Sequence, residues 1–203
     1  ATPISGKYEG ECVVGLLPGS RAQEIERILP VMIDVARGIR ERHLEARFLA
    51  PCVDAARAEQ IRVLAGNFPI EIAQGETYEV LHAARFCMVA SGTATVETAL
   101  FGVPMVILYR VAETTYRLAR AVVDIDTIGM VNILAGRRIV PEFVQHEARP
   151  EAILPVVLNL IADSPERAAM LANLAQVRTD LGSGGASARA ARAILEIVEQ
   201  HRA

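Results

Sequence analysis

Hydrophobic residues along this chain follow two alternating patterns. Short continuous apolar runs, bounded by Gly, Pro or charged residues, predict buried β-strands. Longer stretches in which apolar residues recur every three or four positions predict amphipathic α-helices. The two patterns alternate from residue 12 to residue 181, which is typical of a chain that folds as successive strand–helix units.

The strand pattern occurs repeatedly, in runs that are mostly apolar throughout. A strand with one wet face would alternate apolar and polar residues, so these runs indicate strands buried on both faces. Parallel sheets covered by helices on both sides have this property. The runs predicted to be strands are 12–17, 47–50, 69–73, 86–89 and 105–109.

The helix pattern fills most of the intervening sequence. The first helix follows residue 21 and carries an apolar face from Ile25 to Ile39. Pro30 lies inside it and predicts a kink, or a later start of the regular helix. Residues 124–136 are expected to be irregular, and Pro141 is expected to open a short helix at 141–143. The other predicted helices are 54–65, 77–84, the stretch that includes and follows Glu97, 113–123, 151–162, 164–181 and 186–200.

Together these elements predict an α/β fold: a doubly wound, Rossmann-like parallel sheet with helices on both faces. We expect a polar linker at residues 1–11, an α/β domain at 12–181, and a Gly-rich turn with a C-terminal helix at 182–203. The chain has no initiating Met and opens in a loop-like stretch. We therefore expect it to be the second half of a longer protein.

Composition and charge exclude several classes of protein. The 203 residues are 52% hydrophobic and 22% charged, which is a globular composition. The formal net charge of −3 offers no general attraction for nucleic acid. No apolar run is long enough to span a membrane, and residues 1–10 lack the apolar core of a signal peptide.

The cysteines and histidines suggest no metal chemistry by their spacing. Cys12, Cys52 and Cys87 are far apart and lie beside apolar runs, so we interpret them as reduced, buried thiols of a cytoplasmic protein. The four histidines are also far apart, and no Cys-x-x-Cys pair occurs. We therefore predict no metal ion and no cofactor.

The stretch 90–97, Ala-Ser-Gly-Thr-Ala-Thr-Val-Glu, is the main functional candidate. It joins a predicted strand to a predicted helix through the small residues Ser91, Gly92 and Thr93, so unpaired amides at the helix start are open to an anion. Glu97 follows about one turn later, where a carboxylate can accept hydrogen bonds from a ribose diol. A phosphate cradle beside a diol acceptor describes a nucleotide site. Ordinary helix capping explains the same residues, although the spacing from Thr93 to Glu97 fits a capping box only loosely.

The turn after the first predicted strand, Pro18-Gly19-Ser20-Arg21, also joins a predicted strand to a predicted helix through small residues. An Arg in this place can clamp a diphosphate with two parallel donors. The alternative is a solvated Arg in the first helical turn. Because ligands of doubly wound sheets bind beyond the carboxyl ends of the strands, where both turns lie, we favour the nucleotide interpretation.

Two further polar residues stand out near the end of the sheet. Asn132, in the stretch expected to be irregular, could contact a sugar or phosphate, and turn capping suits it equally well. Glu142 follows Pro141 and is more typical of a helix-start carboxylate.

Four motifs occur in an order that resembles the C-terminal half of lipid-A-disaccharide synthases, inverting glycosyltransferases of the GT-B type. They are LLPGSR at 16–21, ASGTATVE at 90–97, VILYR at 106–110 and NILAGRRIVPEFVQ at 132–145. The resemblance covers nearly the whole chain, and the last motif is the most specific. Arg85 departs from the pattern, because the family usually has Asp there.

The resemblance implies a donor-binding domain. Intact enzymes of this family join UDP-2,3-diacylglucosamine to 2,3-diacylglucosamine 1-phosphate, releasing UDP and the β-1,6-linked disaccharide of lipid A. The acceptor site and the catalytic base would lie in an N-terminal domain outside this chain, so the chain alone is expected to be inactive. The residues implied to bind the donor are Gly19, Ser20, Arg21, Ser91, Gly92, Thr93, Glu97, Asn132 and Glu142. The resemblance also implies that residues 72–75, at the end of the third predicted strand, form a wall for the uracil base.

The resemblance also bears on partners and location. It implies contact with the enzyme's own N-terminal domain, allows a homodimer, and places the enzyme in the cytoplasm with a peripheral contact on the inner face of the inner membrane. Three alternatives stay open: the donor half of another UDP-sugar GT-B enzyme such as the peptidoglycan N-acetylglucosamine transferase, a UDP-N-acetylglucosamine 2-epimerase, and a non-catalytic nucleotide-binding module.

Overall fold

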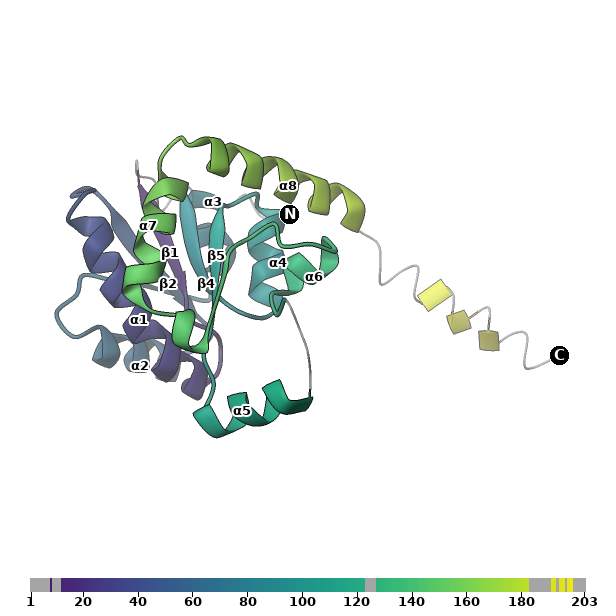
Figure 1. The fold of residues 1–203 in the computed structure, drawn as a ribbon, viewed down its shortest axis with the longest axis horizontal. Helices are drawn as coiled ribbons and strands as arrows, with labels where there is room; N and C mark the ends of the chain where they lie inside the picture. Colours follow the sequence, from purple (N-terminus) through teal and green to yellow (C-terminus); the bar gives the residue numbers. More distant parts are fainter. Residues whose placement is uncertain are drawn as a thin grey trace.

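The protein is an α/β domain built on one parallel sheet, seen in a computed structural model (Figure 1). The structure describes residues 8, 12–122, 127–182, 191–192, 194–195 and 197–198, with the side chains of 118–122 excluded. Nearly all of the predicted linker and most of the predicted C-terminal helix therefore lie outside the described residues. The described positions between 191 and 198 are helical.

Six parallel strands form the sheet in the order β3-β2-β1-β4-β5-β6. They are β1 (Val13–Leu17), β2 (Arg47–Cys52), β3 (Glu71–Gln74), β4 (Phe86–Ala90), β5 (Met105–Tyr109) and β6 (Glu142–Val144). The chain runs outward from β1 to β3, returns to the middle, and runs outward again from β4 to β6. The direction of winding thus changes between β1 and β4, as the doubly wound interpretation predicts.

Helices cover both faces of this sheet. The helices are α1 (Ala22–Arg40), α2 (Ala55–Ala65), α3 (Thr77–Ala83), α4 (Thr93–Leu100), α5 (Glu113–Val122), α6 (Met130–Leu134), α7 (Pro150–Ile161) and α8 (Pro165–Leu181), with a 3₁₀ turn η1 (Gln145–Glu147). Helices α2 and α7 flank α1 on one face, α6 and α8 flank α4 on the other, and α8 also contacts α7. The predicted fold class is therefore confirmed.

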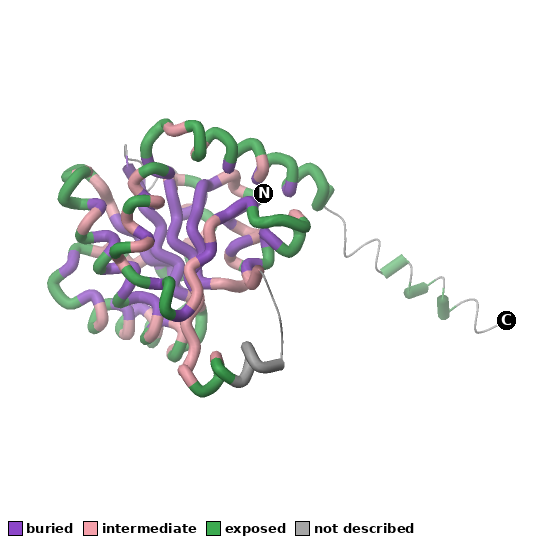
Figure 2. The backbone as a smooth tube through the Cα atoms, in the orientation of Figure 1, coloured by how far each residue is buried: buried purple, intermediate pink, exposed green. Residues whose placement is uncertain are grey.

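The four inner strands, β1, β2, β4 and β5, are buried along nearly their whole length (Figure 2). Every residue of β1 and β4 is buried, which explains why their sequences are apolar without alternation. The two strands also pack closely: a Cβ atom at Gly15 would lie 2.6 Å from Cys87 Sγ. All three cysteines are buried and free, and complete burial raises the pKa of the Cys87 thiol to about 12.

The structure corrects the predictions made for residues 124–143. The short helix expected at 141–143 is wrong, because this segment forms the edge strand β6 and Ile107 N–H donates to Pro141 O at 2.9 Å. Three residues are too few to show a strand pattern, and pairing with β5 is a long-range effect. The stretch expected to be irregular contains α6. Helix α1 starts at Ala22 and continues through Pro30, so the later start considered for it is wrong.

Candidate nucleotide-binding site

The two small-residue turns lie beside each other at the carboxyl edge of the sheet. β1 and β4 are hydrogen-bonded neighbours, with Leu17 opposite Val89, so the turns that follow them leave the sheet side by side. Between them lies a cleft of about 420 Å³, at the point where the winding changes direction. Ligands of doubly wound sheets bind at this point. The cleft is lined by Leu17, Gly19, Ser20, Arg21, Glu24, Pro51, Cys52, Val53, Thr77, Ala90, Ser91, Gly92, Thr93, Ala94, Glu97 and Met130.

The first turn is held by Glu24 from the first turn of α1. Arg21 is the residue that caps α1; its N–H donates to Glu24 Oε2 at 3.3 Å, and its Nη1 donates to Glu24 Oε1 at 2.8 Å. Gly19 has a φ of +105°, and a Cβ atom there would lie 2.5 Å from Glu24 Oε2, so the carboxylate folds directly over the turn. The Arg21 side chain is 82% exposed. A carboxylate of the protein therefore lies where a bound phosphate group would meet Arg21.

The second turn, residues 91–93, is attached to a neighbouring segment of the chain and lines the cleft. Ser91 Oγ donates to Ile128 O at 2.9 Å, which ties the turn to the segment before α6. Gly92 is the N-cap of α4 and has a φ of +154°, which other residues rarely adopt; as a glycine it offers no side chain to cap the helix start. Thr95 Oγ1 donates to Gly92 O at 2.7 Å and so uses none of the amides at the helix start. Gly92, Thr93 and Ala94 line the cleft, so the start of α4 borders it, and a helix start favours an anion.

Glu97 lies on the wall of the cleft and is half-buried. Within the part of the chain that the structure describes, its carboxylate makes no hydrogen bond or ion pair and does not cap α4. A capping carboxylate would accept a bond from the backbone of its own helix start. The geometry therefore favours a carboxylate available to a ligand over the capping alternative.

Asn132 and Glu142 occupy a different environment. Asn132 is 1% exposed; its Oδ1 accepts from the N–H groups of Ile139 and Val140, and its Nδ2 donates to Val140 O and Glu142 Oε1. Glu142 is 7% exposed and also accepts from the N–H groups of Ile128 and Gly129, at 2.8 and 3.0 Å. The pair joins α6, β6 and the segment before α6, and neither residue lines the cleft. A direct contact between either side chain and the donor stays a prediction.

The remaining wall of the cleft comes from the end of β2. Pro51, Cys52 and Val53 line it together with Thr77, whereas residues 72–75, expected to form a wall for a base, do not. Sequence reasoning missed this segment although β2 lies next to β1 in the sheet. The signal was available, because any turn that follows a strand beside β1 must open on the same edge.

A larger cavity lies elsewhere. A groove of about 850 Å³ runs between residues 138–143, α7 and α8, and its lining is mainly apolar. It contains Met170, whose Sδ accepts from the N–H of Met105 at the start of β5. The groove therefore reaches the amino edge of the sheet. Because ligands of doubly wound sheets bind at the carboxyl edge, we place the nucleotide site in the smaller cleft.

A parallel α/β sheet that is wound in two directions from a central switch point is the architecture of one half of GT-B proteins. Solved structures with this fold include S. aureus MnaA with UDP (15% identical, TM-score 0.62, 98% of this chain and 48% of that one) and the calicheamicin glycosyltransferase CalG4 (18%, 0.59, 98% and 46%). At these identities the likeness shows the fold alone.

Sequence comparison gives the family. A family model described as lipid-A-disaccharide synthetase matches residues 7–197, and the chain belongs to this family. Lipid-A-disaccharide synthases of Geobacter metallireducens and Thiobacillus denitrificans are 38% and 41% identical to it, each over 192 residues and 94% of this chain. The chain spans about half the length of the curated relatives it matches, 50% and 51% of these two.

Proposed function

We propose that this chain is the donor-binding half of a lipid-A-disaccharide synthase and that its cleft binds the UDP portion of UDP-2,3-diacylglucosamine. The observation that carries the proposal is the meeting of three complementary groups at one cleft. Arg21 supplies a cation, the start of α4 supplies uncapped amides, and Glu97 supplies an unpaired carboxylate. These groups match a diphosphate and a ribose diol.

The same groups suggest how the domain would assist glycosyl transfer. As the bond between the sugar and UDP breaks, negative charge grows on the β-phosphate. Arg21 and the helix-start amides would stabilise that charge from fixed positions, and such preorganised donors are often the largest single contribution to catalysis. In this proposal the leaving group needs no metal ion.

The other half of the reaction belongs to the rest of the enzyme. We propose that the acceptor, 2,3-diacylglucosamine 1-phosphate, and the catalytic base are held by a second domain facing this cleft, as the half-length match to the relatives suggests. A homodimer, a cytoplasmic location and a peripheral contact with the inner membrane belong to the same proposal. Among the helices that the structure describes, none has the length and apolar character that a membrane crossing requires.

Calorimetric titration of the purified chain tests the proposal. We expect binding of UDP in the presence of EDTA, with weaker binding of ADP and GDP. UDP-N-acetylglucosamine provides a soluble donor analogue, and free uridine separates the ribose contacts from the diphosphate contacts. Binding of ADP without binding of UDP would contradict the proposal. Binding of UDP that is lost in EDTA would contradict its metal-free part.

A further inference from the structure

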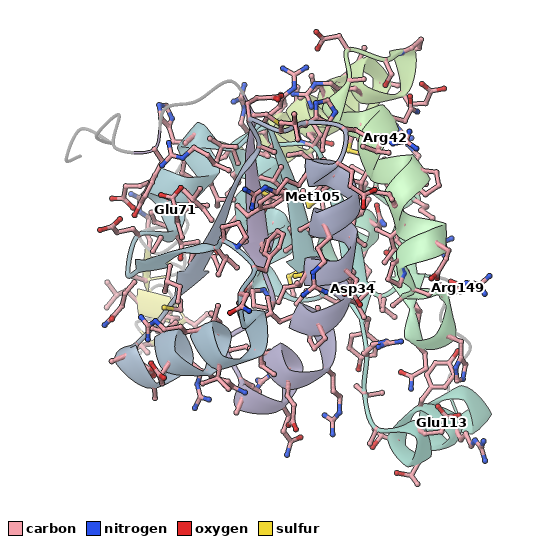
Figure 3. All side chains as sticks on the ribbon, turned by 90° about the vertical axis from the view of Figure 1, so that its left-hand side faces the viewer. Asp34, Arg42, Glu71, Met105, Glu113 and Arg149 are labelled. Carbon is pink, nitrogen blue, oxygen red and sulfur yellow. The ribbon has the colours of Figure 1, made fainter. Side chains whose placement is uncertain are left out.

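Three potential metal ligands meet at the amino edge of the sheet, away from the nucleotide cleft. Cys12 immediately precedes β1, and His43 and Glu45 lie in the turn between α1 and β2. The amino ends of parallel strands form the edge opposite their carboxyl ends. Figure 3 shows this separation: Arg42, in the same turn, lies towards one end of the molecule, and Glu113, which follows β5, lies at the other.

The backbone fixes the two segments against each other. Arg47 N–H donates to Cys12 O at 3.0 Å, so the end of the turn is attached directly to Cys12. His43 is held on both sides, because its N–H donates to Ile39 O at 2.9 Å and its carbonyl accepts from Ala46 N–H at 3.0 Å. The His43 and Glu45 side chains therefore project from a turn whose position relative to Cys12 is already set.

The distances suit a small metal ion. One ligand atom from each of Cys12, His43 and Glu45 lies within 4.8 Å of the other two, and His43 Nδ1 lies 3.5 Å from Glu45 Oε1. Tetrahedral zinc with ordinary Zn–N, Zn–O and Zn–S bonds separates its ligand atoms by about 3.4–3.6 Å. The His–Glu pair already has this separation. The exposed Glu45 and half-exposed His43 side chains can rotate to shorten the remaining distances.

The electrostatic surroundings are mixed. Burial, followed by Glu45, raises the pKa of the Cys12 thiol, whereas Arg85 and Arg167 act in the opposite direction. A metal ion that binds here must displace the thiol proton, because only the thiolate is a zinc ligand. The two Arg side chains favour the thiolate that results, and Asp163 offsets part of their charge, lying 2.7 Å from Arg85 Nη2 and 4.0 Å from Arg167 Nε.

We propose that Cys12, His43 and Glu45 form a zinc-binding site that fastens the α1–β2 turn to the start of β1. A thiolate, an imidazole and a carboxylate are a ligand set typical of zinc. The thiolate and carboxylate balance the charge of the ion. Three protein ligands leave a fourth position for water or for a group from another part of the enzyme. The site is independent of nucleotide binding.

Metal titration of the 203-residue chain, prepared without a polyhistidine tag and treated with EDTA that is then removed, tests this proposal. We expect one equivalent of Zn²⁺ to bind and to raise the thermal midpoint of unfolding. Co²⁺ should give the thiolate-to-cobalt charge-transfer band and the intense visible bands of a tetrahedral site. Mg²⁺ should give neither effect, because it avoids thiolate ligands.

Matched variants distinguish this site from adventitious binding. Loss of even an outer partner of a zinc ligand weakens binding about 10–100-fold, so Cys12→Ser and His43→Gln should weaken Zn²⁺ by at least about 100-fold. Cys52→Ser and His82→Gln, which alter a buried cysteine and an exposed histidine elsewhere, should leave Zn²⁺ affinity unchanged. If Cys12→Ser fails to fold, His43→Gln alone decides. Zn²⁺ affinity equal in the parent and in His43→Gln, or a Co²⁺ complex without the charge-transfer band, would overturn the proposal.

Discussion

The residues first singled out for donor binding divide into two groups with opposite environments. The open half, residues 19–21, 91–93 and 97, faces a cleft, and apart from the Arg21–Glu24 and Ser91–Ile128 contacts its polar groups have few partners among the described residues. The closed half, Asn132 and Glu142, is buried, and each side chain has several partners. Both halves contain polar residues near strand ends. A polar residue at a strand end can therefore serve a ligand or hold neighbouring segments together.

Glu97 and Glu142 make the contrast sharpest, because they are the same residue type. Glu142 replaces the water around its carboxylate with three N–H donors, two from the backbone and one from Asn132. Glu97 keeps its carboxylate available at the cleft. Buried carboxylates are costly unless they are hydrogen-bonded, so truncating the two residues should have different consequences.

The largest effect is expected for Glu142→Ala. It leaves the N–H groups of Ile128 and Gly129 and the Asn132 amide without their acceptor. Unsatisfied buried groups cost about 1–3 kcal/mol each, so the free energy of unfolding should fall by about 3 kcal/mol or more. Urea denaturation measures this loss, and the exposed Glu147→Ala is the matched control. Normal stability together with lost UDP binding would instead place Glu142 in the open half.

For Arg21→Ala a large effect is expected on the affinity for UDP instead of on stability. The loss of a charge-assisted contact should weaken UDP binding by about 1.5–3 kcal/mol, or ten- to a hundred-fold. Uridine lacks the diphosphate and should bind nearly as before. Stability should change little, because the side chain is 82% exposed. Calorimetry with both ligands measures the difference, and Arg37→Ala removes an exposed Arg from the other end of α1 as a control.

The open and closed halves differ in how far the sequence alone could predict them. The fold and the open half were predictable, because apolar runs locate the strands and small-residue turns follow β1 and β4 directly. The closed half was not, because β6 is short and Asn132 contacts Val140 and Glu142 eight and ten positions away. Such bonds depend on tertiary structure and leave no local pattern. The cluster of Cys12, His43 and Glu45 was missed for a related reason, since only the pairing of β1 with β2 brings these residues together.

An intermediate effect is expected for Glu97→Ala. If the carboxylate accepts the ribose hydroxyls, UDP and uridine should both weaken by about 1–2 kcal/mol. A 2′,3′-dideoxy-UDP should bind the parent and the variant equally. A capping role predicts a different result: stability falls by up to about 1 kcal/mol and the folded protein keeps its affinity for UDP. Thermal unfolding and calorimetry on the same preparation separate the two outcomes.

The smallest change in UDP affinity is expected for Glu24→Gln. Whether the affinity rises or falls is more informative than the size of the change. The Glu24 carboxylate bonds both the N–H and the guanidinium of Arg21, so an incoming diphosphate must compete with a charge of its own sign. Gln keeps the size of the side chain and an oxygen that can accept from the Arg21 N–H, and therefore preserves the start of α1. Removing the charge should strengthen UDP binding about two- to five-fold, the size of a surface charge interaction of about 0.4–1 kcal/mol. Glu26→Gln removes the same charge from the same helix while leaving the Arg21–Glu24 pair in place. If Glu24→Gln weakens UDP binding instead, the carboxylate serves to orient Arg21 towards the ligand, and the first turn resembles the closed half more than the open one.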